Sequence, residues 1–285
     1  MQLAFPWSED DCLMFAAFLG ERRLSGNSIR TYCGCLKTLH SSLGLPFSRP
    51  DILSKVIKGL EHMNGTPGAT PRRTHVTPQQ LAFLQTKVEA APLPRRTRDL
   101  VWMCFSWQWH GCLRVSEVAA ATASSFLDST LKGKDVSIQA LEGHPGRNYI
   151  LLTLRDFKHS KKSALVELLP TGRPTCPVKA YQEVFREGPP DPDSPLVTIS
   201  PGLFVGPRLL NQVLSEAFKG TLPPGTTIST HSLRMGLPTL MGARGYSESE
   251  IQLQGRWNSD SYLSYCREGR GLRLKDQLDL FNALF

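Results

Sequence analysis

Residues 231–265 read HSLRMGLPTLMGARGYSESEIQLQGRWNSDSYLSY, and the interpretation of the whole chain starts from them. Among its side chains are the imidazole of His231, the guanidinium of Arg234, the indole of Trp257 and the phenols of Tyr262 and Tyr265. Glycines interrupt it, and the spacing of its apolar residues predicts helices over 231–245 and 247–255. A helix that only fills a hydrophobic core has no need of this polar set. We therefore interpret the stretch as part of a reactive site.

A second basic motif lies upstream in GCLRVSE, where Arg114 stands three residues before Glu117. On a helix, His231 and Arg234 lie at positions i and i+3 and share one face. Arginine binds the non-bridging oxygens of a phosphate with forked donors and stabilises the charge of a pentacovalent transition state. A nearby tyrosine can serve as the nucleophile and form a covalent phosphotyrosine. The set therefore predicts phosphoryl transfer through a tyrosine.

The composition narrows the class of protein and of partner. The chain has 285 residues and a formal net charge of +8, which favours a polyanionic partner, either nucleic acid or an anionic membrane. Its seven cysteines show no CxxC spacing, so we expect reduced, buried thiols in an intracellular protein. There is no HxH, HExxH or P-loop motif, so we expect no metal and no other cofactor. Neither a signal peptide nor an apolar run long enough to span a bilayer is present, so we expect no membrane association.

The apolar pattern predicts a mainly α-helical fold with a small antiparallel β-sheet. Helical stripes are followed by NGTPGATPRRTHVTP, which is rich in Gly and Pro and has no periodicity, as is typical of a linker. We predict a helical domain, a linker, a larger domain and an apolar tail, over residues 1–64, 65–77, 78–270 and 271–285. Two predicted strands, at 149–155 and 164–169, flank the basic hairpin tip RDFKHSKKS.

Taken in order, the motifs resemble those of the tyrosine recombinases, the DNA strand-transfer family of phage integrases and related transposon enzymes. GCLRVSE resembles the family's first arginine box, LRDFKHSKK the hairpin with its lysine, and HSLR the HxxR box. GRW puts Trp257 where the family has His or Trp, and SDSYLSY ends on Tyr265 as the expected nucleophile. The resemblance covers nearly the whole chain. It implies a helical, SAM-like core-binding domain followed by an α+β catalytic domain, in the style of Crypton- and DIRS-type transposon recombinases.

The resemblance also implies a role for each matched residue. Tyr265 attacks the scissile phosphate, while Arg114 and Arg234 hold it. His231 assists proton movement near the tyrosine, Lys158 protonates the leaving 5′-oxygen, and Trp257 donates a hydrogen bond to the phosphate. Glu117 orients Arg114 or His231. The implied catalytic set is Arg114, Lys158, His231, Arg234, Trp257 and Tyr265, with Glu117 in support.

The implied activity is site-specific recombination of double-stranded DNA through a 3′-phosphotyrosine, independent of metal and ATP, for the integration or excision of a mobile element. It implies a homo-tetramer on two DNA sites, with the apolar tail docked into a neighbouring protomer, and a nuclear location in a eukaryotic host. Phosphate contacts are expected from basic residues throughout the chain: Arg30, Lys37, Lys55, Arg72, Arg73, Lys161 and Lys162.

Several alternatives stay open on the sequence alone. Tyr262 competes with Tyr265 as the nucleophile, since both follow Trp257 on one predicted helix and differ by three positions. Lys161 and Lys162 compete with Lys158 on the same hairpin tip. A DNA-binding protein that has lost catalysis and a type IB topoisomerase-like enzyme are the alternative functions. Two departures from the family pattern bear on activity: Met235 follows HSLR, and Pro238 lies within the helix that comes after it.

Overall fold

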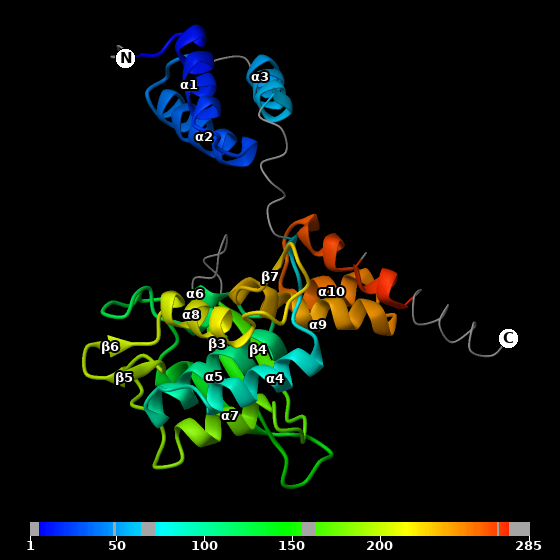
Figure 1. Cartoon of the computed structure of the whole chain (residues 1–285). Helices are drawn as coiled ribbons and strands as arrows, with labels where there is room; N and C mark the ends of the chain where they lie inside the picture. The colour runs from blue at the N-terminus through cyan, green and yellow to red at the C-terminus, as the bar shows by residue number, and fades with distance from the viewer. Residues whose placement is uncertain (1–5, 48–49, 64–71, 156–162, 267, 274–285) are drawn as a thin grey trace, which may run out of the picture. The chain divides into compact units, whose positions relative to one another are not determined.

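The computed structural model describes residues 6–47, 50–63, 72–155, 163–266 and 268–273 (Figure 1). The chain divides into two compact units, Met1–Arg72 and Arg73–Phe285. Lys158, Lys161 and Lys162 lie outside the described residues, as does the predicted tail from residue 274. The fold class predicted from the sequence, mainly helical with a small antiparallel sheet, is confirmed.

The first unit is built from three helices, α1 (Glu9–Glu21), α2 (Gly26–Ser42) and α3 (Pro50–Met63). Ser8 caps α1 through a reciprocal pair of hydrogen bonds with Asp11. The core is small because each helix contributes only a narrow apolar stripe. Its buried members are Ala16, Leu19, Ile29, Cys33, Leu53 and Ile57.

The second unit begins earlier than the sequence predicted. Strand β1 (Arg72–Arg73) pairs with β7 (Thr226–Thr227). The backbone N–H of Thr74 donates to the carbonyl of Thr227 at 3.0 Å, and Val76, fully buried, donates to Ser232 at 3.1 Å. Residues 73–77, which we predicted as the end of a linker, therefore belong to the second unit, because their backbone is hydrogen-bonded and Val76 fills its core.

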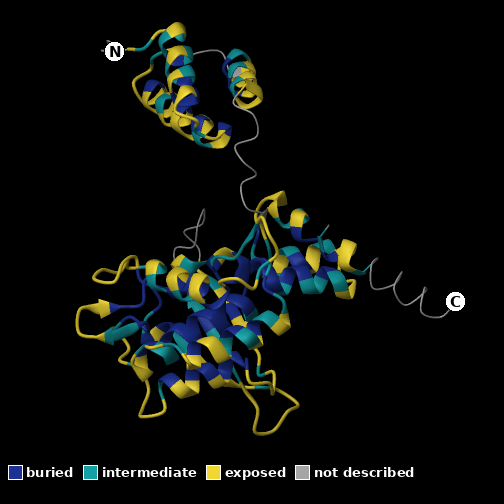
Figure 2. Cartoon of the chain, viewed as in Figure 1, coloured by how far each residue is buried: buried dark blue, intermediate teal, exposed yellow. Residues whose placement is uncertain are grey.

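Helix α5 (Arg95–His110) forms the centre of the second unit. Four helices pack around or near it: α4 (Pro78–Glu89), α7 (Pro177–Val184), α8 (Pro207–Ala217) and α9 (Thr230–Arg244). From Leu100 to Trp109 every residue of α5 is buried (Figure 2). Two of its indoles have buried hydrogen-bond partners, since Trp107 Nε1 donates to the carbonyl of Pro177 at 3.0 Å and Trp109 Nε1 to that of Val76 at 2.8 Å.

One antiparallel sheet lies beside these helices, in the order β2 (Val136–Ala140), β3 (Asn148–Leu154) and β4 (Ala164–Leu168). The predicted strands correspond to β3 and β4, and β2 was missed. Ile150, Leu152 and Leu154 of β3 face the core at alternate positions, whereas β2 is exposed along nearly its whole length. The sequence of β2, VSIQA, does alternate apolar and polar residues, but Ile138 is 52% exposed, so the alternation marks no buried face. Two short strands, β5 (Thr198–Ser200) and β6 (Leu203–Phe204), form a separate pair.

The C-terminal part contains α10 (Glu248–Gly255), the 3₁₀ turn η2 (Asp260–Tyr262) and helical residues 263–266 and 268–273. The last segment approaches α9 closely at Gly269, where a Cβ would collide with the backbone of Thr239 and Ala243, and Gly242 faces it across a tight contact. Pro238 lies inside α9 and is buried there. In the part of the chain that the structure describes, no helix has the length and apolar character needed to cross a membrane.

Candidate active site

A cavity of about 770 Å³ opens between the start of α6 (Val115–Val118), the start of α9 and the segment after α10. It is lined by five of the residues predicted from the sequence: Arg114, His231, Arg234, Trp257 and Tyr265. They come from positions as far apart as 114 and 265, so only the tertiary fold brings them together. The other lining residues are small, polar or apolar neighbours of these five, apart from one further arginine, Arg256.

Glu117 is the buried centre of the arginine side of the site. It caps the start of α6, where its Oε2 accepts from the backbone N–H of Arg114 at 2.7 Å. Its Oε1 accepts from Nη1 of the same arginine, also at 2.7 Å. The side chain of Glu117 is 8% exposed and that of Arg114 is 25% exposed. Glu117 therefore holds Arg114 at the cavity wall with two charge-assisted hydrogen bonds.

Arg234 is buried even more deeply, with 2% of its side chain exposed. Its Nη1 donates to the carbonyl of Cys112 and its Nη2 to that of Gly255, both at 2.7 Å. Burial lowers the pKa of Arg234 to about 10, so it remains a cation at neutral pH. Its guanidinium also stacks over the ring of Trp257, with 5.1 Å between its central carbon and the ring centroid.

Arg256 completes the arginine side and was missed by the sequence analysis. Its Nη1 donates to the carbonyl of Gly111 at 3.0 Å, and its Nη2 donates to Cys112 at 3.4 Å and to Glu117 Oε2 at 3.3 Å. The GRW motif was interpreted only through its tryptophan. The glycine of that motif is also required, because a Cβ at Gly255 would overlap the ring of Trp257.

The rest of the reactive lining, which we call the tyrosine side of the cavity, is formed by Tyr265 and His231, and the Tyr265 hydroxyl lies 3.1 Å from Nε2 of His231. His231 is exposed at the rim, whereas Tyr265 is 7% exposed. Partial loss of solvation and the neighbouring guanidinium groups, first of all that of Arg73, lower the pKa of His231 to about 4. Burial raises the pKa of Tyr265. At neutral pH a neutral phenol therefore faces a neutral imidazole that can accept its proton.

Tyr262 and Tyr265 differ in burial: Tyr265 is buried, whereas Tyr262 is half-buried and packs against the same cluster from outside. Tyr265 packs with Met235, Ile251, Trp257 and Cys266 in a small buried cluster. Its ring centroid lies 5.2 Å from that of Trp257, compared with 6.4 Å for Tyr262. Tyr262 ends the 3₁₀ turn η2, so the two tyrosines do not stand on one continuous α-helix as predicted. Of the two, only Tyr265 lines the cavity.

The strand that leads into the lysine hairpin is anchored at its end. Arg155, immediately after β3, donates through Nη2 to Asp135 Oδ2 at 2.6 Å. Asp135 is buried and also accepts from the backbone N–H of Lys132 at 2.8 Å. The candidate lysines that follow Arg155, Lys158, Lys161 and Lys162, lie outside the described residues.

The predicted DNA-binding residues lie in both units. In the first unit Lys37 and Lys55 are exposed, and Arg30 is in an ion pair with Glu61 at 3.1 Å. In the second unit Arg73 is exposed on β1. Among the described residues, no group of three or more His, Cys, Asp or Glu side chains is arranged to hold a metal ion.

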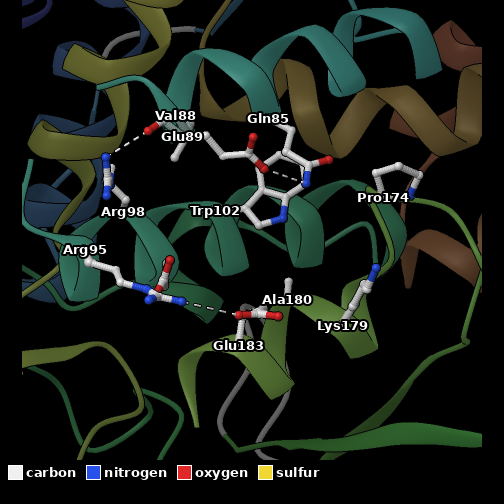
Figure 3. Close-up of a pocket in the computed structure, with 11 residues that line it drawn as sticks. Gln85, Val88, Glu89, Arg95, Arg98, Trp102, Pro174, Lys179, Ala180 and Glu183 are labelled. Carbon is white, nitrogen blue, oxygen red and sulfur yellow. Dashed lines mark hydrogen bonds and ion pairs between the residues drawn. The ribbon is translucent and has the colours of Figure 1, made fainter. Parts of the chain in front are cut away.

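A second hollow, of about 340 Å³, lies between α4, α5 and α7 and contains none of the predicted site residues (Figure 3). Three cations, Arg95, Arg98 and Lys179, and three carboxylates, Glu89, Asp99 and Glu183, line it together. Gln85 donates to Glu89 at 3.0 Å, and Arg95 lies 3.9 Å from Glu183. The described residues that line this hollow therefore carry no surplus of positive charge, whereas those that line the main cavity include arginines and no carboxylate.

Comparisons with known proteins give a match at the level of structure alone. No protein-family model matches the sequence, and no curated protein matches it. The XerH site-specific recombinase in a post-cleavage complex with a palindromic difH substrate is similar, with a TM-score of 0.64 and 16% identity over 97% of this chain and 73% of that chain.

Two integrases bound to DNA are similar as well. The Tn1549 transposon integrase with a circular intermediate DNA gives a TM-score of 0.57 and 15% identity over 95% of this chain and 85% of its own. A lambda integrase dimer bound to a COC′ core site gives a TM-score of 0.54 and 12% identity over 92% of this chain and 81% of the integrase chain. The chain therefore has the tyrosine recombinase fold.

Proposed function

We propose that this chain, which has the tyrosine recombinase fold, cuts and rejoins double-stranded DNA at specific sites through a 3′-phosphotyrosine formed on Tyr265. The observation that carries the proposal is the 3.1 Å contact between the Tyr265 hydroxyl and His231 Nε2, in a cavity lined by Arg114 and Arg234. A nucleophile with a base and two cations converging on one space is what attack on a phosphodiester requires. The DNA-bound recombinases with the same fold support this choice of substrate.

In the first step, Tyr265 Oη attacks the scissile phosphorus and the bond from phosphorus to the 5′-oxygen breaks. The phenolic proton passes to Nε2 of His231, which is neutral because its pKa is held near 4. Approach of the phosphate adds a negative charge beside the imidazole. That charge raises the pKa of His231 and makes it a better base when DNA is bound.

The guanidinium groups supply the electrostatic part of catalysis. Arg114, one-quarter exposed, and Arg234, almost wholly buried, both line the cavity and would donate to the non-bridging oxygens as charge builds up in the transition state. Both are already held by hydrogen bonds, so little reorganisation is needed when the phosphate arrives. In this proposal Trp257 donates through its indole N–H to the same phosphate and packs against the ring of Tyr265.

The leaving 5′-oxygen takes a proton from Lys158, or from Lys161 or Lys162 on the same hairpin. The second step reverses the first, since a 5′-hydroxyl attacks the phosphotyrosine and releases Tyr265. Each step exchanges one phosphodiester for another, so the overall balance needs no nucleotide hydrolysis.

We further propose that the reaction serves the integration or excision of a mobile element, as in Crypton- and DIRS-type elements. It would take place in a homo-tetramer on two DNA sites, inside the cell and in the nucleus of a eukaryotic host. Deletion of residues 272–285 should abolish pairing of two DNA sites but leave binding to a single site intact. An unchanged assembly state on DNA would contradict that role for the tail.

Covalent trapping tests the proposal directly. The protein is mixed with nicked suicide duplexes from candidate element ends or a random pool, denatured, and analysed on a gel for a protein–DNA adduct. We expect an adduct with the wild type and with Tyr262→Phe, and none with Tyr265→Phe. The two variants each remove one phenolic oxygen from neighbouring tyrosines, so each controls for the other.

The other outcomes separate the alternatives. An adduct lost only in Tyr262→Phe would keep the reaction and move the nucleophile. Salt-dependent DNA binding without an adduct, in a pool shown to contain a bound site, would identify a DNA-binding protein without catalysis. Relaxation of a supercoiled plasmid that lacks any specific site would instead indicate a topoisomerase of type IB.

A further inference from the structure

We propose that Arg256 is a positioning residue that holds Glu117 and the turn at Cys112, and through them Arg114 and Arg234, in the geometry that cleavage requires. The inference rests on the proposed function and adds a residue to it. Its evidence is a strained backbone, a buried guanidinium and a set of acceptors shared with the two proposed catalytic arginines.

The backbone at Arg256 indicates that this side chain is needed. The residue ends α10 in the left-handed conformation, with φ 53° and ψ 45°. Glycine is the usual residue at such a helix end, because a Cβ there is sterically unfavourable. A long side chain retained at this point suggests that its contacts offset the strain.

The guanidinium of Arg256 points into the protein, where 12% of the side chain is exposed. Both terminal nitrogens donate to protein oxygens, at Gly111, Cys112 and Glu117, over 3.0–3.4 Å. Two of these acceptors belong to the turn that precedes Arg114. Cys112 itself has a φ of 49°, so this turn is also strained and depends on its hydrogen bonds. Arg256 thus ties the end of α10 to the start of α6.

Arg256 also competes with Arg234 for the carboxylate of Glu117. Glu117 Oε2 lies 3.3 Å from Arg256 Nη2 and 3.8 Å from Arg234 Nη1. The carbonyl of Cys112 is likewise shared, with Arg234 at 2.7 Å and Arg256 at 3.4 Å. Without Arg256, Glu117 would draw Arg234 toward itself and away from a phosphate in the cavity. The loss would appear in the transition state, where Arg234 is needed most, and hardly in DNA affinity.

The test compares Arg256→Gly with Arg23→Gly in the full chain. Arg23 is also left-handed, at φ 56°, and exposed in the first unit, so the control removes the same charge from the same kind of backbone. The readouts are the single-turnover rate of adduct formation on saturating suicide duplex, the Kd for that duplex, and the thermal midpoint. For Arg256→Gly we expect the adduct rate to fall about 30-fold or more and Kd to change less than about threefold. For Arg23→Gly we expect a rate within about twofold of the wild type.

Two further variants keep the test decisive if Arg256→Gly folds poorly. Arg256→Lys keeps the charge but cannot reach three oxygens at once, so we expect an intermediate rate at an unchanged thermal midpoint. In a Glu117→Gln background, Arg256→Gly should lower the rate of adduct formation by less than about threefold relative to Glu117→Gln alone, because both changes disrupt the same contact.

Each remaining outcome contradicts a different claim. A wild type that forms no Tyr265-dependent adduct would overturn the proposed function, and with it this inference. If the wild type forms the adduct and both Arg256→Gly and Arg256→Lys form it at the wild-type rate, the inference alone would be overturned. Additive costs in the Glu117→Gln background, or a loss wholly in Kd, would also overturn it, since Arg256 would then act independently of Glu117 or as a DNA-binding residue.

Discussion

The two sides of the cavity are held in opposite ways. On the arginine side, Glu117 and Arg234 are almost wholly buried, and both are cross-linked to the turn at residues 111–114 by several hydrogen bonds. On the tyrosine side, a single contact of 3.1 Å joins Tyr265 to His231, which is exposed at the rim. Both sides line the same space.

This difference fits the work proposed for each side. Groups that stabilise a developing charge act best when they are fixed in advance in a poorly solvated site, and this favours burial and redundant bonds. A nucleophile must travel to phosphorus and back, so a multiply bonded hydroxyl would hinder it. We therefore expect substitutions on the arginine side to reduce both stability and chemistry, and those on the tyrosine side to reduce chemistry alone.

The largest expected effect is that of Arg234→Ala on stability. The free energy of unfolding should fall by about 3–5 kcal/mol, because the change removes a buried donor from the carbonyls of Cys112 and Gly255 and a cation that lies 3.8 Å from the buried Glu117. Urea unfolding followed by tryptophan fluorescence measures it, since most tryptophans lie in the second unit: Trp102, Trp107, Trp109 and Trp257.

Arg244→Ala on the same helix is the matched control. Arg244 is exposed at the end of α9, so its replacement should change the free energy of unfolding by no more than about 0.5 kcal/mol. If Arg234→Ala cost as little as this control, the two sides of the cavity would not differ in the way described.

An intermediate effect is expected from pH. The pKa of His231 is near 4 in the free protein, and bound phosphate raises it, so the apparent value for cleavage should lie between about 4 and 6.5. Above that value the imidazole is neutral and the rate of adduct formation should be flat. Below it the rate should fall about tenfold per pH unit. A His231→Ala variant should be slow and lack this acid limb.

Acid unfolding must be separated from that limb. The pKa of His110 is also near 4, because burial outweighs its hydrogen bond to the carbonyl of Thr175. Its folded pKa lies below the unfolded value of 6.5, so its contribution to stability is present above pH 6.5 and is lost as the pH falls toward 4. His110→Gln can keep the N–H donor without titrating. If the fall in the cleavage rate at low pH were absent in His110→Gln, that fall would be caused by unfolding and not by protonation of His231.

The smallest expected effect is that of Tyr265→Phe on stability. The ring keeps its packing against Trp257 and Cys266, and only a hydroxyl bonded to an exposed imidazole is removed. The free energy of unfolding should change by less than about 1 kcal/mol, although the adduct is lost. Urea unfolding beside Tyr262→Phe measures this. A cost above about 2 kcal/mol would show that the hydroxyl has a structural role and would weaken the contrast between the two sides.

Much of the site could be predicted because its residues stand in short local motifs. GCLRVSE, HSLR and GRW each place a functional side chain at a fixed distance from a glycine or a helix start, and such spacings are visible in sequence. The long helices were predicted for the same reason, since α5 and α9 carry extended patterns. Strand β2 was missed although its sequence, VSIQA, alternates apolar and polar residues; four of its five residues are exposed, so the alternation does not mark a buried face.

What the sequence determined by itself is the chemistry that is available: the helices, the small sheet, and a tyrosine, a histidine and arginines in an order that resembles one family. Only the tertiary structure decided which groups meet. It places the Tyr265 hydroxyl beside His231, which is 34 residues away in the sequence. It also shows that residues 73–77 are hydrogen-bonded to the second unit. It also turned Arg256 inward onto Glu117. Local patterns encode helices and turns because those depend on near neighbours. Hydrogen bonds between distant segments depend on how helices pack, which no local pattern records.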